Sequence, residues 1–246
     1  MKKRIDLLIV EKRITETRNK AQMLVSSGQI LINGKKISKN SSKYQSNINI
    51  TIDDSSRQWV SRGALKLLHA INHFDIDLKN KVCLDIGAST GGFTEVLLSR
   101  GAKKIYAVDV GTNQMHKKLL TNKKVINITQ INARYLDKNI INQKIEMIVC
   151  DVSFISLKKV IKPSLLFLDK KFGIIIALIK PQFELNKREI GKNGIISDHK
   201  IHQRICNDYK KWFEIDCNMK VIGIIPSPIK VSKGNIEFLI YAKRKT

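Results

Sequence analysis

The segment that most constrains the fold lies between residues 82 and 94, where an apolar run meets a glycine-rich turn. It reads V-C-L-D-I-G-A-S-T-G-G-F-T and continues into residues with helical apolar spacing. This pattern predicts a strand, a loop and a helix. Glycine has no side chain and tolerates positive φ, so such a loop can hold a ligand against bare backbone.

The spacing of the acid and the glycines separates the ligands that such loops bind. A phosphate loop would end in G-K-[ST] and a dinucleotide loop would read G-x-G-x-x-G, and the segment has neither pattern. Asp85, Gly87 and Gly91 are similar to motif I of S-adenosylmethionine (SAM) methyltransferases, D-x-G-x-x-x-G. Taken alone, the spacing also fits a strand-to-helix turn that binds nothing.

A second acid follows a second apolar run. Residues 104 to 108 predict a strand, and Asp109 comes directly after it, 24 residues beyond Asp85. In doubly wound sheets an acid at this position binds ribose hydroxyls. The alternative is a solvated loop aspartate, but two successive strand ends of this kind favour a nucleoside pocket.

The charge of the chain points to a polyanionic partner. Its 246 residues include 45 Lys and Arg against 21 Asp and Glu, which gives a net charge of +24. This excess favours nucleic acid, because cations neutralise phosphates and release counterions. Drift in base composition, which enriches Lys, Ile and Asn, would also produce it.

The sequence carries no sign of a membrane segment or a metal site. No apolar run approaches the ~20 residues of a membrane span, and the first residues lack the apolar region of a signal peptide. We therefore expect a cytoplasmic protein with no membrane partner. The four cysteines form no C-x-x-C pair, and Cys83 and Cys150 lie in apolar runs where buried thiols are expected.

The first 56 residues predict a small α+β domain. Apolar spacing predicts a helix over 5–10 and a second over 17–25, followed by a strand over 29–32 that meets an Asn-Gly turn, and a closing strand over 47–52. The motifs R-I-D at 4–6, T-R-x-K-A at 17–21 and G-Q-I-L-I-N-G at 28–34 resemble the S4 RNA-binding domain. The resemblance implies phosphate contacts by basic residues that are otherwise ordinary solvated charges: Arg4, Arg18, Lys20 and Lys35, with Arg62 beyond the R-Q-W-V linker at 57–60.

The remaining residues, 61–246, predict a larger α/β domain. A helix is expected from residue 61, and further strands over 125–128, 145–151, 172–181, 220–225 and 236–242, with a loop over 182–197 and a helix over 199–213. Strands that alternate with helices pair in parallel and collect ligands at their carboxyl ends. We expect a Rossmann-like domain with a mostly parallel seven-stranded sheet.

Four charged residues stand out because they lie beside apolar elements: Lys66, Asp151, Lys180 and Glu237. A lysine at the end of a buried strand is costly unless it is paired or functional, although a long side chain can also reach water. With the motifs S-R-G-A-x-K-L, D-V-S-F-I-S-L, K-P-Q-F-E and G-N-x-E-F, the chain resembles the TlyA family over its whole length. That family joins an S4 domain to a domain of the FtsJ class of RNA 2′-O-methyltransferases, whose Lys-Asp-Lys-Glu tetrad matches these four residues.

The resemblance implies transfer of a methyl group from SAM to a cytidine 2′-OH of large-subunit, and in some members also small-subunit, ribosomal RNA or ribosomal subunits. Lys180 would act as base in its neutral form, which a dry pocket and nearby cations favour, with Asp151 orienting it. The implied donor site comprises Asp85, Gly87, Ser89, Thr90, Gly91, Gly92, Phe93, Asp109 and Asn132. The alternatives are an RNA-binding assembly factor with little or no methyltransferase activity and, because the family carries a haemolysin label, a membrane-active protein.

Overall fold

The computed structural model describes residues 2–15, 17–26, 28–52, 59–186, 189, 194–229 and 234–245. The chain forms two compact units, Met1–Trp59 and Val60–Thr246. They divide at Trp59, inside the predicted linker. Arg57 and Gln58 of that linker, and the predicted boundary at 53–56, lie outside the described residues.

The N-terminal unit packs two helices against short antiparallel strands. The helices are α1 (Ile5–Glu11) and α2 (Arg18–Ser26), and the three-stranded sheet has the order β3 (Lys35–Ile37), β2 (Ile30–Ile32), β5 (Ile50–Ile52). Asn33 and Gly34 join β2 to β3 with φ of +50° and +79°, which matches the turn that favours Asn-Gly in hairpins. The core contains Ile5, Leu8, Ile9, Ala21, Val25, Ile30 and Ile32.

Three strands of this unit have no signal in the sequence. β1 (Lys2–Arg4) pairs with β4 (Lys43–Gln45), and β3 pairs with β2. Each is only three residues long and mostly polar, with the sequences K-K-R, K-K-I and K-Y-Q, so no apolar alternation marks it.

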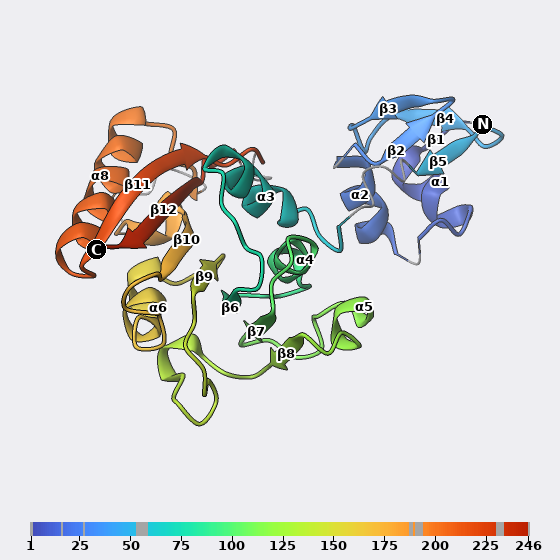
Figure 1. Ribbon diagram of the computed structural model, residues 1–246. Helices are drawn as coiled ribbons and strands as arrows, with labels where there is room; N and C mark the ends of the chain where they lie inside the picture. Colours follow the sequence, from blue (N-terminus) through green and yellow to red (C-terminus); the bar gives the residue numbers. More distant parts are fainter. Residues whose placement is uncertain are drawn as a thin grey trace. The chain divides into compact units, whose positions relative to one another are not determined.

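The C-terminal unit is built on the predicted seven-stranded sheet (Figure 1). Its five parallel strands are β6 (Val82–Ile86), β7 (Lys104–Val108), β8 (Val125–Ile128), β9 (Met147–Cys150) and β10 (Ile174–Ile179). Two antiparallel strands, β11 (Met219–Pro226) and β12 (Phe238–Arg244), complete the order β11-β12-β10-β9-β6-β7-β8. The expected fold class is therefore confirmed.

Helices cover both faces of this sheet (Figure 1). α6 (Leu157–Ser164) and α8 (His199–Ile215) pack on one face, where Ile161, Trp212 and Phe213 join the main core. α3 (Ala64–His73) and α4 (Gly92–Ser99) pack on the other. The burial of both faces explains why β9 and β10 read as continuous apolar runs.

Several predicted boundaries need correction. The helix expected from residue 61 begins at Ala64, because residues 61–63 form a turn whose carbonyls accept from the first helical N–H groups. The strand expected over 172–181 spans only Ile174–Ile179, and Phe172 is exposed. The loop expected over 182–197 begins inside a short helix, α7 (Pro181–Glu184), because proline at the first helical position favours a helix start. No helix in the described ranges is long and apolar enough to cross a membrane.

Candidate active site

The candidate site lies at the carboxyl edge of the parallel strands. Gly87 follows β6, Asp109 follows β7, Asp151 follows β9 and Lys180 follows β10. Because the five strands run in the same direction, their carboxyl ends lie along one edge of the sheet. The fold thus brings together residues that lie almost one hundred positions apart in the sequence.

Four side chains at this edge form a chain of alternating charges. Lys180 Nζ lies 2.6 Å from Asp151 Oδ1, and Lys66 Nζ lies 3.2 Å from Asp151 Oδ2. Lys66 Nζ also lies 2.7 Å from Glu237 Oε2. The order is Lys180, Asp151, Lys66, Glu237, so each interior member contacts two opposite charges. These are the four residues of the predicted tetrad, and they come from four separate segments of the unit.

Burial makes the charge pairing in this tetrad necessary. Lys180 and Glu237 are buried, and an isolated charge in such a place would carry a large desolvation cost. Burial alone would lower the pKa of Lys66, but the charges of Asp151 and Glu237 outweigh it and raise that pKa. Burial would likewise raise the pKa of Asp151, but Lys66 and Lys180 hold it below its ordinary value. The pairing keeps Asp151 an acceptor at neutral pH.

Two further residues, which were not predicted as part of the site, lie in the D-V-S-F-I-S-L motif close to Asp151 in the sequence. Ser153 Oγ accepts a hydrogen bond of 2.9 Å from Lys180 Nζ, which fixes the ammonium group from a second side. Phe154 is 90% exposed at a φ of +64°, which is rare for a bulky residue, and its ring centre lies 5.0 Å from that of Phe183. An exposed aromatic ring in a strained backbone suits contact with a ligand.

Asn235 is a third residue that was not predicted as part of the site. It is buried, its Oδ1 accepts from the backbone N–H of Ile196 at 2.9 Å, and its Nδ2 donates to the carbonyl of Gly194 at 2.8 Å. It therefore ties the segment before α8 to the turn that carries Glu237. The G-N-x-E-F motif contains it, but partners 39 and 41 positions away leave no local signal.

The glycines of the loop after β6 serve packing as well as access. Gly87 has a φ of +81°, and a Cβ there would lie 2.5 Å from the carbonyl oxygen of Asp151. Gly91 has a φ of +94°, and a Cβ there would lie 2.1 Å from Leu119. A Cβ at Gly92 would lie 2.2 Å from Ser61 Oγ. Glycine is required most strongly at Gly87, where a Cβ would meet backbone, whereas at Gly91 and Gly92 the first atom met belongs to a side chain.

The exposed tip of this loop lies beside the half-buried Asp109. Ser89 and Thr90 are exposed, and Ser89 has a φ of +47°. Asp109 accepts from the backbone N–H of Ser89 at 2.8 Å and from that of Gly111 at 2.7 Å. Each carboxylate oxygen keeps a further lone pair for a hydroxyl group. This combination of loop amides and an acid at the next strand end fits the nucleoside of SAM.

Two predicted donor-site residues are placed differently. Phe93 is buried within α4, so it does not line the exposed tip of the loop. Asn132 caps the short 3-10 helix η2 (Ala133–Tyr135), where its Oδ1 accepts from the backbone N–H and the Nε of Arg134. The side-chain amide nitrogen of Asn132 is the group that could donate to an adenine edge.

Asp85 lies inside the sheet and not at its surface. It is fully buried, and Thr94 Oγ1 donates to its Oδ2 at 2.6 Å. Burial raises the pKa of Asp85 to about 7, against the opposing hydrogen bond from Thr94. The role predicted for it, shaping the loop, is consistent with the bond to Thr94 on α4.

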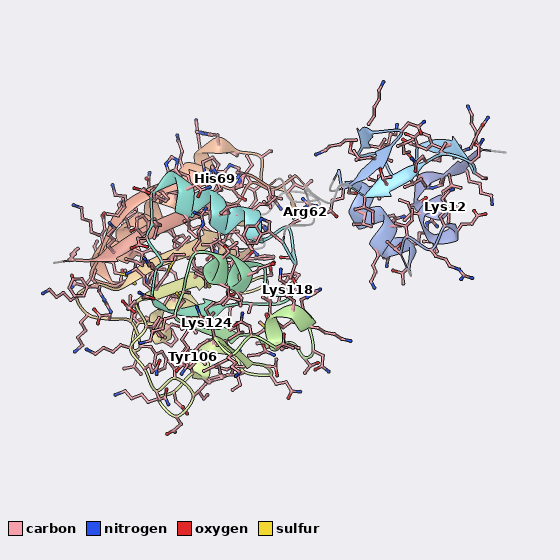
Figure 2. The ribbon with its side chains drawn as sticks, turned by 45° about the vertical axis from the view of Figure 1, so that its right-hand side comes forward. Lys12, Arg62, His69, Tyr106, Lys118 and Lys124 are labelled. Carbon is pink, nitrogen blue, oxygen red and sulfur yellow. The ribbon has the colours of Figure 1, made fainter. Side chains whose placement is uncertain are left out.

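The end of the linker is anchored beside the same loop. The backbone N–H of Val60 donates to the buried Glu95 Oε2 at 2.5 Å, and Lys118 Nζ donates to Glu95 Oε1 at 2.7 Å. Glu95 belongs to α4, directly after the glycine loop, and Lys118 belongs to α5 (Lys117–Leu120). Arg62 is exposed two residues further along (Figure 2).

Two of the predicted RNA-contacting residues have partners within the N-terminal unit. Arg4 Nε lies 3.1 Å from Asp6 Oδ1, and Arg18 Nε lies 3.0 Å from Asp6 Oδ2. Burial would raise the pKa of Asp6, but hydrogen bonds from Arg4, Gln22 and Arg18 hold it well below its ordinary value. Any phosphate would share these guanidinium groups with Asp6. Lys20 and Lys35 are exposed.

The comparison with known families decides what this architecture belongs to. The family described as FtsJ-like methyltransferase matches residues 59–244. The chain belongs to the FtsJ-like methyltransferase family. The S4 domain family matches residues 3–47, which confirms the S4 resemblance of the N-terminal unit.

Individual relatives of this FtsJ-like chain span nearly its full length. Hemolysin A of Brachyspira hyodysenteriae is 41% identical over 97% of this chain and 98% of its own. The 16S/23S rRNA (cytidine-2′-O)-methyltransferase TlyA of Mycobacterium tuberculosis (strain CDC 1551 / Oshkosh) is 34% identical over 99% of this chain and 90% of its own. A solved hemolysin-like protein from Streptococcus thermophilus superposes with a TM-score of 0.77 at 36% identity, over 99% of this chain and 89% of its own. These likenesses confirm the resemblance to the TlyA family.

Proposed function

We propose that this chain transfers the methyl group of SAM to the 2′-OH of a cytidine in ribosomal RNA, in the cytoplasm. The observation that carries the proposal is the chain of four alternating charges at the carboxyl edge of the sheet. The S4 domain and the net charge of +24 support an RNA substrate. The TlyA relative that acts on 16S and 23S rRNA supports the choice of ribosomal RNA, free or within subunits, and of cytidine.

The donor would bind along the ends of β6 and β7. We assign the ribose hydroxyls of SAM to Asp109, which the Ser89 amide holds in place, and its amino-acid end to the exposed loop tip at Ser89 and Thr90. When bound there, SAM supplies an electrophilic methyl group on a sulfonium. Gly87, Gly91 and Gly92 set the shape of the loop, with Asp85 and Phe93 behind it, and Asn132 would meet the adenine.

The acceptor side would be organised by the tetrad. A ribose hydroxyl is a poor nucleophile, and it must be aligned with the methyl group while it loses its proton. We assign that proton to Lys180 Nζ, which would enter the step as the neutral amine, having first released its own proton, and leave it as the ammonium; Asp151 and Ser153 hold it in place. Lys66 and Glu237 would position the ribose and complete the proton network, and alignment alone can contribute several kcal/mol.

Phe154 offers a place for the base of the acceptor nucleotide. Its ring is 90% exposed and lies three residues beyond Asp151 in the sequence. Bases of RNA that leave their stack are held by aromatic side chains. Such a contact would hold the ribose near the tetrad without reading the sequence of the strand.

Methyl transfer from labelled SAM to unmodified ribosomal RNA transcripts tests the proposal. We expect Lys180→Met to reduce the rate of methyl transfer at saturating SAM by at least about 100-fold. Because Lys180 is assigned to the acceptor ribose and not to the donor, calorimetry should show SAM affinity within about twofold of wild type. Substantial methyl transfer by Lys180→Met would show that Lys180 is not the base. Incorporation that survives Asp151→Ala would remove the tetrad mechanism, and mapping 2′-O-methyl positions in both rRNAs identifies the target.

A further inference from the structure

A basic pocket lies in the C-terminal unit outside the tetrad. It has a volume of about 610 Å³ and is lined by Arg134, Lys158, Lys159, Lys162 and Pro163. Among the residues described by the structure, none of these four cations forms an ion pair with an acid. Cations gathered without a carboxylate between them create a positive potential that favours an anionic ligand.

Arg134 is held in position on one side of this basic pocket. Its Nε donates to Asn132 Oδ1 at 3.2 Å, and its guanidinium carbon lies 5.3 Å from the ring centre of Tyr135. Tyr135 is itself 70% exposed, so its ring remains available to a ligand. A planar cation fixed on an exposed aromatic ring matches both a phosphate and a base.

Lys158 is held in position on the other side. Its Nζ lies 5.2 Å from the ring centre of Tyr209 and 5.7 Å from that of Trp212 on α8. Such cation–π contacts reduce the rotamer entropy that the side chain loses on binding. Lys159 and Lys162 are exposed and lie three positions apart on α6, so their Cβ atoms are separated by about 5–6 Å.

The basic pocket shares an edge of the sheet with the tetrad. Arg134 belongs to η2, which follows the carboxyl end of β8, and the lysines belong to the first two turns of α6, which begins six residues after Asp151. β8 and β9 run in the same direction within the sheet. A strand whose ribose lies at the tetrad could therefore continue along this edge.

We propose that the basic pocket binds phosphodiester groups of the RNA strand that carries the target ribose, an inference that rests on the proposed function. An RNA strand brings a negative charge with every nucleotide, which suits several cations spaced along a helix and across to η2. SAM carries one carboxylate and a sulfonium, so four cations do not match its charge. The pocket is thus an acceptor-strand site and not part of the donor site.

Removal of the two exposed lysines tests the inference. The variant is Lys159→Gln with Lys162→Gln, and the matched control is Lys210→Gln with Lys211→Gln, two exposed lysines of α8. Filter binding of an unmodified large-subunit rRNA transcript, without SAM, is measured over a series of salt concentrations. We expect the pocket variant to lose affinity by about tenfold, and its slope of log K against log salt to fall by roughly 1.4–1.8, as two lost phosphate contacts require. The control should change little.

Three results would overturn the inference: wild-type RNA affinity in the pocket variant, an equal loss in the control variant, or a loss of SAM affinity by calorimetry, which would assign the pocket to the donor. Crosslinking of a 4-thiouridine transcript to the wild-type chain should also recover peptides containing α6. RNA binding is measured here without methyl transfer. A chain that binds RNA through this pocket but transfers no methyl group would refute the proposed function and leave only the RNA contact of the pocket standing.

Discussion

The buried carboxyl group of Asp85 leads us to expect that the stability of the C-terminal unit depends on pH. Its carboxyl group is fully buried in β6, where Thr94 Oγ1 donates to one oxygen, and the other oxygen has no hydrogen-bond partner among the described residues. Burial raises the pKa of Asp85 to about 7, from 3.8 for an exposed aspartate. The folded chain therefore holds this proton over a pH range in which the unfolded chain has released it.

The size and sign of the effect follow from that pKa difference. A folded pKa above the unfolded one means that the stabilising contribution is complete below about pH 4 and is lost as the pH rises through about 7. About three pH units at 1.36 kcal/mol each amount to about 4 kcal/mol. Asp85→Asn keeps the shape and a hydrogen bond to Thr94 but has no proton to lose. We expect it to approach wild-type stability near pH 4 and to exceed it by up to about 4 kcal/mol above pH 8.

Urea unfolding at a series of pH values from 4 to 8 measures this difference. Both chains carry Trp59→Phe, so that the fluorescence of Trp212 reports on the C-terminal unit, and other titrating groups cancel between them. Thr94→Val is a second variant; it removes the hydrogen bond to the carboxylate and should raise the pKa of Asp85 further, moving the transition to higher pH. A stability difference between Asp85→Asn and its parent that stays constant over this range would contradict the raised pKa of Asp85.

Further substitutions test the other contacts. Gly87→Ala places a methyl group 2.5 Å from the backbone of Asp151 at a φ of +81°. The strain, about 1–3 kcal/mol or more, should lower the midpoint of thermal unfolding and impair methyl transfer. An unchanged unfolding midpoint would contradict the contact. Asp6→Asn should destabilise the N-terminal unit by about 2–3 kcal/mol, because Arg4 and Arg18 lose their shared carboxylate. Faster amide hydrogen exchange in α1 and α2 would report this loss. In the wild type the contribution of Asp6 is present above about pH 4 and is lost as the pH falls through its lowered pKa. Phe154→Ala should raise the KM for RNA and lower the methylation rate, while SAM affinity and stability stay unchanged, because the exposed ring is assigned to the RNA and not to the donor. Phe154→Tyr should retain activity. Equal loss of activity in both variants would argue against stacking of an RNA base on this ring.

The parallel sheet and three of its strand ends could be predicted because the apolar runs of β7, β9 and β10 each stop at a charged residue. Asp109, Asp151 and Lys180 all mark such stops, and the topology then forces them to one edge. The order of the charge chain could not be predicted, since spacing does not reveal that Lys66 lies between Asp151 and Glu237.

Other features depend on partners that are distant in the sequence. Arg4 and Arg18 are predicted to contact RNA phosphates, with ordinary solvated charges as the alternative, yet both contact the buried Asp6. Gly92 reads as access for a ligand, yet its missing side chain admits Ser61. In each case the sequence shows which residue is present but does not show which distant residue it contacts.

The position of β12 in the sheet has a consequence for when the site exists. β12 is the last strand that the structure describes, yet it inserts between β10 and β11, and Glu237 directly precedes it. Until residues 237–244 have left the ribosome and paired with both neighbours, Lys66 lacks one of its two carboxylates and β11 has no strand beside it. A partly synthesised chain that lacks β12 therefore cannot have a complete tetrad, and the tetrad becomes complete only after β12 has entered the sheet.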